Sequence, residues 1–134
     1  MTRVAFQGVA GAYSEEAVRQ YFGAAVETLA CPTLEEVFPE VEGGRAAYAM
    51  LPVENAVAGA VAGAYELLLE RDLRINAEVI LRVRHMLLAV PGTQRSQVRR
   101  VRSHPQALAQ CQRYLDRYGL HAEPAFDTAG SARD

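Results

Sequence analysis

Small, neutral polar side chains gather in four short segments, each at a turn between a predicted strand and a predicted helix. The segments are FQGVAGAYS (residues 6–14), LPVENAVAG (51–59), SHPQALAQC (103–111) and DTAGSA (127–132). In open α/β sheets, ligands bind beyond the carboxyl ends of strands and over the N-termini of helices. Several such turns around one crevice would bind an anion with more than one carboxylate. Each turn taken singly also has the composition of an ordinary helix cap.

Arginine supplies every positive side-chain charge, because the chain has 14 arginines and no lysine against 16 acidic residues. The net charge of −2 gives no electrostatic basis for binding nucleic acid or an anionic membrane. Without lysine the chain cannot form a Schiff base or carry a P-loop lysine. Anionic ligands would have to be bound by arginine, backbone amides or neutral side chains.

No metal site is expected, since Cys31 and Cys111 lack the spacing of zinc ligands and are interpreted as buried free thiols. No stretch approaches the run of about 18 apolar residues that a membrane span requires. The first residues, MTRVAFQG, contain no apolar export signal, so we expect a cytoplasmic protein.

Strands and helices alternate along the whole sequence. Apolar runs predict strands at residues 3–7, 26–30, 46–53, 74–90 (one long strand or two), 98–102 and 120–126. Helices are predicted at residues 14–23, 33–43, 57–70 and 103–118, with a further one beginning at 127. This alternation predicts an α/β fold with a largely parallel sheet in each of two lobes, at about residues 1–75 and 76–134.

Three of the predicted helices have polar residues that suit their first turn. Ser14 is the predicted N-cap of the first helix. Thr33 and Glu36 have capping-box spacing, and so do Ser103 and Gln106.

The four polar segments, in this order, resemble the prephenate dehydratases and the similar plant-type arogenate dehydratases. The resemblance runs from Val4 to Ala132 and includes INAEVILRVRHMLLA (75–89), which is similar to the family's Glu…His-x-Leu-Leu run. SHPQALAQC and LPVEN are its most specific parts.

The resemblance implies two α/β lobes like those of a type II periplasmic binding protein, with the active site in the cleft between them. It implies a hydro-lyase of phenylalanine biosynthesis that converts the small molecule prephenate to phenylpyruvate, with no metal or organic cofactor. It also implies a homo-oligomer, a dimer or a tetramer. Prephenate is a dianion, so it needs helix ends, amides and arginine, and a poorly solvated place for the carboxylate that leaves. The departing hydroxyl needs a proton donor.

The matching positions imply roles for nine residues. Asn55 would hold the substrate hydroxyl or a carboxylate, and Glu54 would orient Asn55, act in the cleft or simply be solvated. Ser103 and Gln110 lie two helical turns apart and could project from one face. The expected catalytic residues are Asn55, Ser103, Gln110 and Glu54, and the expected substrate-binding residues are Tyr13, Ser14, His104, Asp127 and Thr128. His104 could also serve as an acid, whereas His85 is expected to be structural.

The sequence departs from the family at its end. The family carries a Thr-Arg-Phe motif downstream of the DTA-like turn, and its Thr is a candidate for assisting hydroxyl departure. The sequence ends at Asp134 without that motif and without the regulatory domain that has a Glu-Ser-Arg-Pro signature. A smaller departure is Ala56, where serine is common in the family. We therefore expect a catalytic domain that is incomplete at its C-terminus.

Two hypotheses follow for the chain as it stands. It is either part of an active dehydratase or a module that binds the dianion without turnover and folds only as an oligomer. A secreted solute-binding protein is disfavoured because no export signal is evident. The choice between prephenate and arogenate stays open. Unpaired backbone and apolar surface predict low solubility or dimerisation.

Overall fold

The computed structural model describes all 134 residues as two compact units, Met1–Arg82 and Val83–Asp134. Each unit combines helices with a parallel sheet. None of the helices has the length and apolar character that crossing a bilayer requires.

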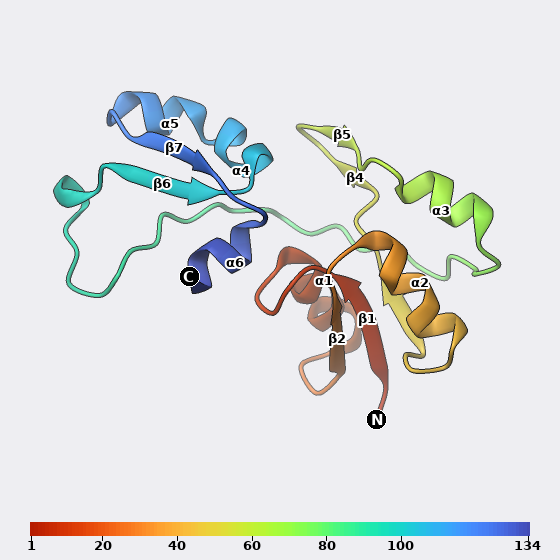
Figure 1. The fold of residues 1–134 in the computed structure, drawn as a ribbon. Helices are drawn as coiled ribbons and strands as arrows, with labels where there is room; N and C mark the ends of the chain where they lie inside the picture. The colour runs from red at the N-terminus through yellow and green to blue at the C-terminus, as the bar shows by residue number, and fades with distance from the viewer. The chain divides into compact units, whose positions relative to one another are not determined.

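The first unit is built on a three-stranded parallel sheet of β1 (Arg3–Gln7), β2 (Glu27–Cys31) and β3 (Tyr48–Met50), in the order β2-β1-β3 (Figure 1). All three strands were predicted. β3 is shorter than the predicted run of residues 46–53.

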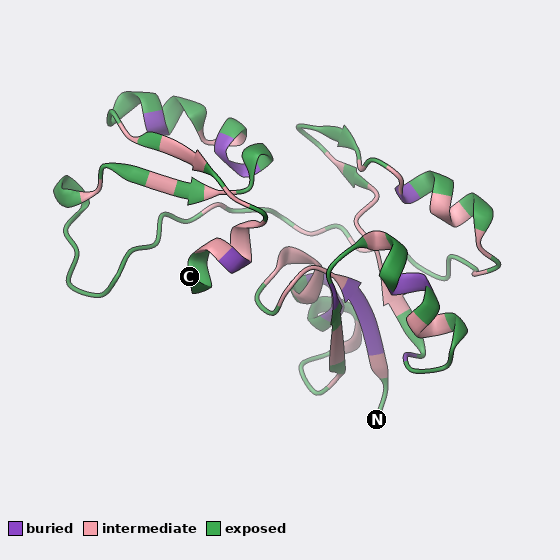
Figure 2. Ribbon diagram, in the orientation of Figure 1, coloured by how far each residue is buried: buried purple, intermediate pink, exposed green.

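Helices pack on β1 from both faces. α1 (Tyr13–Phe22) and α2 (Leu34–Glu42) both contact it. Successive side chains of β1 point to opposite faces, so Val4 and Phe6 join the cluster of Val18 from α1, while Ala5 joins the cluster of Val37 from α2. Figure 2 shows β1 buried along most of its length. A central strand covered on both faces explains the continuous apolar sequence VAF.

The strand order reverses between β1 and β3. The chain passes from β1 through α1 to β2, and then through α2 to β3 on the other side of β1. In such sheets the crevice at this reversal, beyond the carboxyl ends of the two strands, is where ligands bind. The fold therefore brings the segment after β1 and the segment after β3 to the same edge of the sheet.

The predicted helix at residues 57–70 is wrong in its first half. Only α3 (Ala64–Glu70) is helical, and the preceding residues form an antiparallel pair of β4 (Glu54–Asn55) and β5 (Gly59–Ala60). Gly59 and Gly63 have φ angles of 79° and 82°, which lie in the left-handed region and interrupt a right-handed helix.

The predicted long strand at residues 74–90 is also wrong. Residues 72–89 form neither helix nor strand. A strand needs a neighbour for its backbone hydrogen bonds, and no other strand of the chain pairs with this segment. One contact that holds it is the hydrogen bond from Gln20 Nε2 to the carbonyl of Ile80, at 3.3 Å.

The second unit has a parallel pair of strands, β6 (Arg100–Ser103) and β7 (His121–Pro124), preceded by the short 3-10 helix η1 (Arg95–Gln97). Ser103 lies opposite Pro124, so both strands end at the same edge. Both strands were predicted, each within a few residues of its observed bounds.

Three short helices accompany β6 and β7. They are α4 (Pro105–Gln110), α5 (Gln112–Arg117) and α6 (Thr128–Arg133). The single helix predicted at residues 103–118 is therefore two helices, because the N–H of Cys111 is shared between the carbonyls of Ala107 and Leu108 at 3.1 Å each, a tightening that ends α4.

Candidate active site

The glycine-rich turn after β1 leads directly into α1. The N-cap of α1 is Ala12, not Ser14 as predicted, and Ala12 offers no side-chain acceptor. Tyr13 and Ser14 are the first two residues of the helix, and both are half-buried. Serine is common at N-caps, but its presence does not tell which of several small residues begins the helix.

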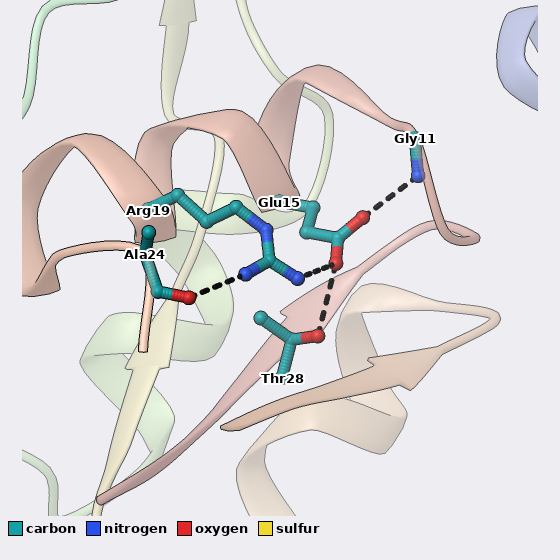
Figure 3. A network of polar contacts seen from close by, with 5 residues as sticks. All are labelled: Gly11, Glu15, Arg19, Ala24 and Thr28. Atoms are coloured by element: carbon teal, nitrogen blue, oxygen red, sulfur yellow. Dashed lines mark hydrogen bonds and ion pairs between the residues drawn. The ribbon is translucent and has the colours of Figure 1, made fainter. Parts of the chain in front are cut away.

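Glu15 binds the groups around it through both carboxylate oxygens (Figure 3). Its Oε2 accepts from the N–H of Gly11 at 2.7 Å, and its Oε1 accepts from Arg19 at 2.8 Å and from the Thr28 hydroxyl at 3.0 Å. The N–H of Gly11 is the main cause that lowers the pKa of the Glu15 carboxyl below its usual value. Burial opposes this effect, and the Arg19 and Thr28 donors lower the pKa further. Sequence reasoning placed Glu15 only near the helix dipole; its position at N3, typical of a capping box, was the signal for a bond back to the turn.

Asn55 closes the turn between β4 and β5. Its Oδ1 accepts from the N–H of Val57 at 2.9 Å and from the N–H of Ala58 at 3.2 Å. The side-chain NH2 makes no hydrogen bond in the structure. The oxygen is thus committed to the turn, and the amide is left to act as a donor.

Glu54 is tied to α3. The Tyr65 hydroxyl donates to Glu54 Oε1 at 2.5 Å, which joins the β4–β5 pair to the helix that follows. This hydrogen bond raises the pKa of Tyr65, because the neutral phenol is the form that donates to the carboxylate. No local sequence pattern indicated that Tyr65 would be the partner of Glu54.

Ser103 lies at the carboxyl end of β6, and Thr128 is the first residue of α6. The Ser103 hydroxyl donates to Thr128 Oγ1 at 3.1 Å. The capping-box spacing predicted Ser103 as the N-cap of α4, and this prediction is wrong. His104 takes that position, and its Nδ1 accepts from the N–H of Gln106 at 3.0 Å.

Asp127 is the N-cap of α6. Its carboxylate accepts a short hydrogen bond from the N–H of Gly130, and its carbonyl accepts from the Ser131 hydroxyl at 2.6 Å. A Cβ on Gly130 would lie 2.6 Å from the Asp127 carboxylate, so a larger residue at this position would displace that carboxylate.

Gln110 ends α4, at the opposite end of that helix from Ser103. Its Oε1 lies 2.6 Å from His85 Nε2. An amide oxygen only accepts, so His85 Nε2 carries the proton in this contact. As in Asn55, the carboxamide is bound through its oxygen, and its NH2 remains available as a donor.

The nine residues singled out in the sequence divide between the units. In the first unit, the turns that carry Tyr13, Ser14, Glu54 and Asn55 leave the same edge of the sheet. In the second unit, the hydroxyl groups of Ser103 and Thr128 are hydrogen-bonded to each other. No group of three or more His, Cys, Asp or Glu side chains is arranged to hold a metal ion.

A profile of the family described as "Prephenate dehydratase" matches residues 4–134. The chain belongs to the prephenate dehydratase family. Its relatives include "Arogenate dehydratase/prephenate dehydratase 2, chloroplastic" of Arabidopsis thaliana, 46% identical over 131 residues, which are 98% of this chain and 34% of the relative. Another is the "Bifunctional N-acyl-homoserine lactone acylase/prephenate dehydratase" of Komagataeibacter europaeus, 43% identical over 96% of this chain and 46% of the relative.

Solved structures agree with this membership of the prephenate dehydratase family. The quorum-quenching acylase GqqA superposes with a TM-score of 0.86 at 42% identity, over 96% of this chain and 46% of that one. The prephenate dehydratase of Arthrobacter aurescens, solved in complex with L-Phe, superposes with a TM-score of 0.74 at 25% identity, over 98% and 44%. The chain spans about a third of the length of the Arabidopsis relative, 34%.

Proposed function

We propose that this chain is the catalytic part of a hydro-lyase that converts prephenate to phenylpyruvate, releasing carbon dioxide and water, in phenylalanine biosynthesis. The observation that carries the proposal is the family match over residues 4–134, together with 46% identity to a relative named for this reaction. In the same proposal, the chain has the two-lobed fold of a type II periplasmic binding protein.

Two carboxamides support the proposal that neutral groups bind the dianion. Asn55 and Gln110 each use their oxygen within the protein, so each offers a ligand only N–H donors. Donors aimed at carboxylate or hydroxyl oxygens stabilise charge without adding a group that must titrate. Tyr13 and Ser14, in the first turn of α1, add donors at the positive end of a helix dipole.

Loss of the ring hydroxyl requires a proton donor or a strong hydrogen bond. Because the Ser103 hydroxyl donates to Thr128, the hydroxyl hydrogen of Thr128 is free to point elsewhere. In the proposal, the Thr128 hydroxyl donates a hydrogen bond to the departing hydroxyl of the substrate. His104 and Asp127, as the N-caps of α4 and α6, order the turns that precede these helices. The ring C–C bond to the carboxylate breaks as its electrons form the aromatic ring, so no nucleophile is needed.

The test is the conversion of prephenate to phenylpyruvate, followed by the absorbance of phenylpyruvate in base. The 134-residue chain is assayed beside the complete open reading frame that encodes it. Turnover by either one supports the proposal. Absence of turnover by both, with intact folding shown by circular dichroism, contradicts it. Turnover by the longer form alone assigns an essential role to residues beyond position 134.

Arogenate is an alternative substrate, since several relatives are named arogenate dehydratases at 44–46% identity. It differs from prephenate by an ammonium in place of the oxo group. Parallel assays with arogenate, measuring phenylalanine, give the ratio of kcat/KM values that decides the preference. Binding of either compound without turnover would instead indicate a ligand-binding module.

A second activity, hydrolysis of N-acyl-homoserine lactones, is favoured by one observation. The chain is 42% identical to GqqA at a TM-score of 0.86 and is also similar to the bifunctional acylase of Komagataeibacter europaeus. Incubation with an N-acyl-homoserine lactone and measurement of released homoserine lactone tests it. An acylase activity that is unchanged in Asn55→Asp, while prephenate turnover falls, would depend on other residues.

A further inference from the structure

The first turn of α1 lacks an ordinary cap. The first N–H groups of any α-helix have no intrahelical partner, and a side chain at the N-cap normally accepts from one of them. Ala12 occupies the N-cap and has no acceptor. The polar side chain that reaches back from the helix is Glu15, and its partner is the N–H of Gly11, which lies one residue before the cap.

The carboxylate of Glu15 is itself fixed by two other elements. Thr28, on β2, donates to Oε1, and so does Arg19, one turn along α1. Arg19 also donates to the carbonyl of Ala24 at 3.1 Å, in the turn between α1 and β2 (Figure 3). The side chain of Glu15 is only 12% exposed, whereas that of Arg19 is 44% exposed. The Gly11 amide is thus linked to the strand that pairs with β1.

The turn that Glu15 holds has few other constraints. Gly8 and Gly11 have φ angles of 128° and 88°, which other residues rarely adopt. The backbone–backbone hydrogen bonds of the turn run from the N–H of Gly8 to the carbonyl of Cys31 at 2.8 Å, from the N–H of Ala12 to the carbonyl of Val9 at 3.0 Å, and from the N–H of Glu16 to the carbonyl of Ala12 at 3.2 Å. Glycine loses more conformational freedom on ordering than any other residue, so a single charge-assisted bond at Gly11 has a large effect on this loop.

We infer that Glu15 is a positioning residue of the substrate site, whose carboxylate holds the Gly8–Ala12 turn and thereby fixes the first turn of α1, where Tyr13 and Ser14 lie. It is not an acid or a base in the reaction, because both of its oxygens accept hydrogen bonds from the protein. The role of the turn in substrate binding rests on the proposed function. The ordering of the turn by Glu15 does not.

The experiment compares Glu15→Gln with Glu16→Gln in the complete open reading frame and in the 134-residue chain. Glutamine at position 15 keeps the shape but loses the charge, and one of its two terminal atoms can no longer accept. Glu16 is the matched control, because it is the next residue of the same helix and its side chain is exposed. Hydrogen–deuterium exchange of a peptide covering residues 8–14 reports the order of the turn. KM and kcat for prephenate report whether the turn contributes to substrate binding and turnover.

Exchange in residues 8–14 is expected to quicken roughly tenfold in Glu15→Gln, as loss of a charge-assisted hydrogen bond allows, and to stay unchanged in Glu16→Gln. KM should rise by about the same factor while kcat changes less, since the groups that meet the departing hydroxyl lie elsewhere. Thr28→Val removes one donor to the carboxylate and should produce a smaller change in the same direction. If Glu15→Gln does not fold, Thr28→Val is used in its place for the same measurements.

Two results overturn the inference. Unchanged exchange in both Glu15→Gln and Thr28→Val shows that the carboxylate does not order the turn. Faster exchange with an unchanged KM shows that the turn does not serve the substrate site. If the wild-type protein turns over no prephenate, the proposed function fails, and binding of prephenate measured by calorimetry replaces KM, with loss of affinity in Glu15→Gln as the supporting result and equal affinity as the contrary one.

Discussion

A carboxamide that is bound through its oxygen can offer a ligand only its NH2 group, and this holds for both Asn55 and Gln110. Asn55→Asp separates the two functions of the side chain. Aspartate still accepts from Val57 and Ala58, so the turn should persist. It replaces a donor with a negative oxygen, which in the proposed function would repel a dianionic substrate. We expect kcat/KM for prephenate to fall by about 10²–10³ with little change in thermal stability.

The control for this prediction is Asn55→Ala, which removes the donor and also leaves the two turn amides without their acceptor. It should lower both activity and stability. An Asn55→Asp enzyme with wild-type kcat/KM would contradict the donor role of Asn55 and would direct attention to the oxygen instead.

Glu15 also makes the stability of the fold depend on pH. Its pKa is lowered in the folded protein from a reference value of 4.5, chiefly by the Gly11 N–H. A lowered pKa means that the carboxylate stabilises the fold fully above pH 4.5 and loses this effect as the pH falls through the folded value. The stability difference between wild type and Glu15→Gln should therefore be constant near neutral pH and shrink below pH 4.5. Urea unfolding midpoints between pH 7 and pH 3, roughly the range where carboxylates titrate, test this.

At the residue scale, the sequence located the polar turns but not their hydrogen bonds. Thr33 could be identified as a cap because its partner Glu36 is three residues away. The partners of Glu54 and Gln110 are 11 and 25 residues away, and only the fold brings them together.

At the scale of single elements, local signals were most reliable where one side chain sets the boundary. Thr33 begins α2 as predicted, accepting from the N–H of Glu36 at 3.3 Å. Thr33→Ala should lower the free energy of unfolding by about 1 kcal/mol, as loss of an N-cap does, and Thr33→Ser should leave it nearly unchanged. Equal losses in both variants would show that the methyl group, not the hydroxyl, matters here.

The prediction of a long strand at residues 74–90 was wrong for a different reason. Alternating apolar residues indicate that a segment can form a strand, but the strand exists only if a neighbour supplies its hydrogen bonds. β1 had two such neighbours in β2 and β3. That information lies in pairing between distant segments, and sequence periodicity does not contain it.

The core of the first unit depends on a few large side chains. Phe38 of α2 is 1% exposed, whereas Phe126, which lies between β7 and α6, is 75% exposed. Phe38→Ala should cost about 3–5 kcal/mol through lost burial and the cavity that remains. Phe126→Ala should change stability by less than about 0.5 kcal/mol. Chemical unfolding of the two variants measures the difference, and similar losses in both would contradict the packing seen here.

At the scale of the whole molecule, charge is unevenly divided between the units. Residues 1–82 contain six arginines and twelve acidic residues, a net charge of −6, and residues 83–134 contain eight arginines and four acidic residues, a net charge of +4. The overall charge of −2 hides this division, so the sequence total alone suggested no attraction for anions. In the proposed function, the positive charge of the second unit would attract the dianionic substrate.

Exposed apolar side chains are concentrated in the segment of residues 74–90, which was predicted to form a strand but has no strand partner. Its members more than about two-thirds exposed are Ile75, Ile80, Met86, Leu88 and Val90. Monomeric proteins rarely leave such a run uncovered, and its unpaired backbone groups can also form hydrogen bonds with another chain.

We therefore expect the 134-residue chain to self-associate at micromolar concentrations in sedimentation velocity. The double variant Ile80→Glu/Leu88→Glu should shift it toward the monomer. Leu69→Glu is the control, because Leu69 is 88% exposed but lies on α3. A wild-type chain that sediments as a monomer at every concentration, or a Leu69 variant that dissociates as the double variant does, would show that this segment does not drive association.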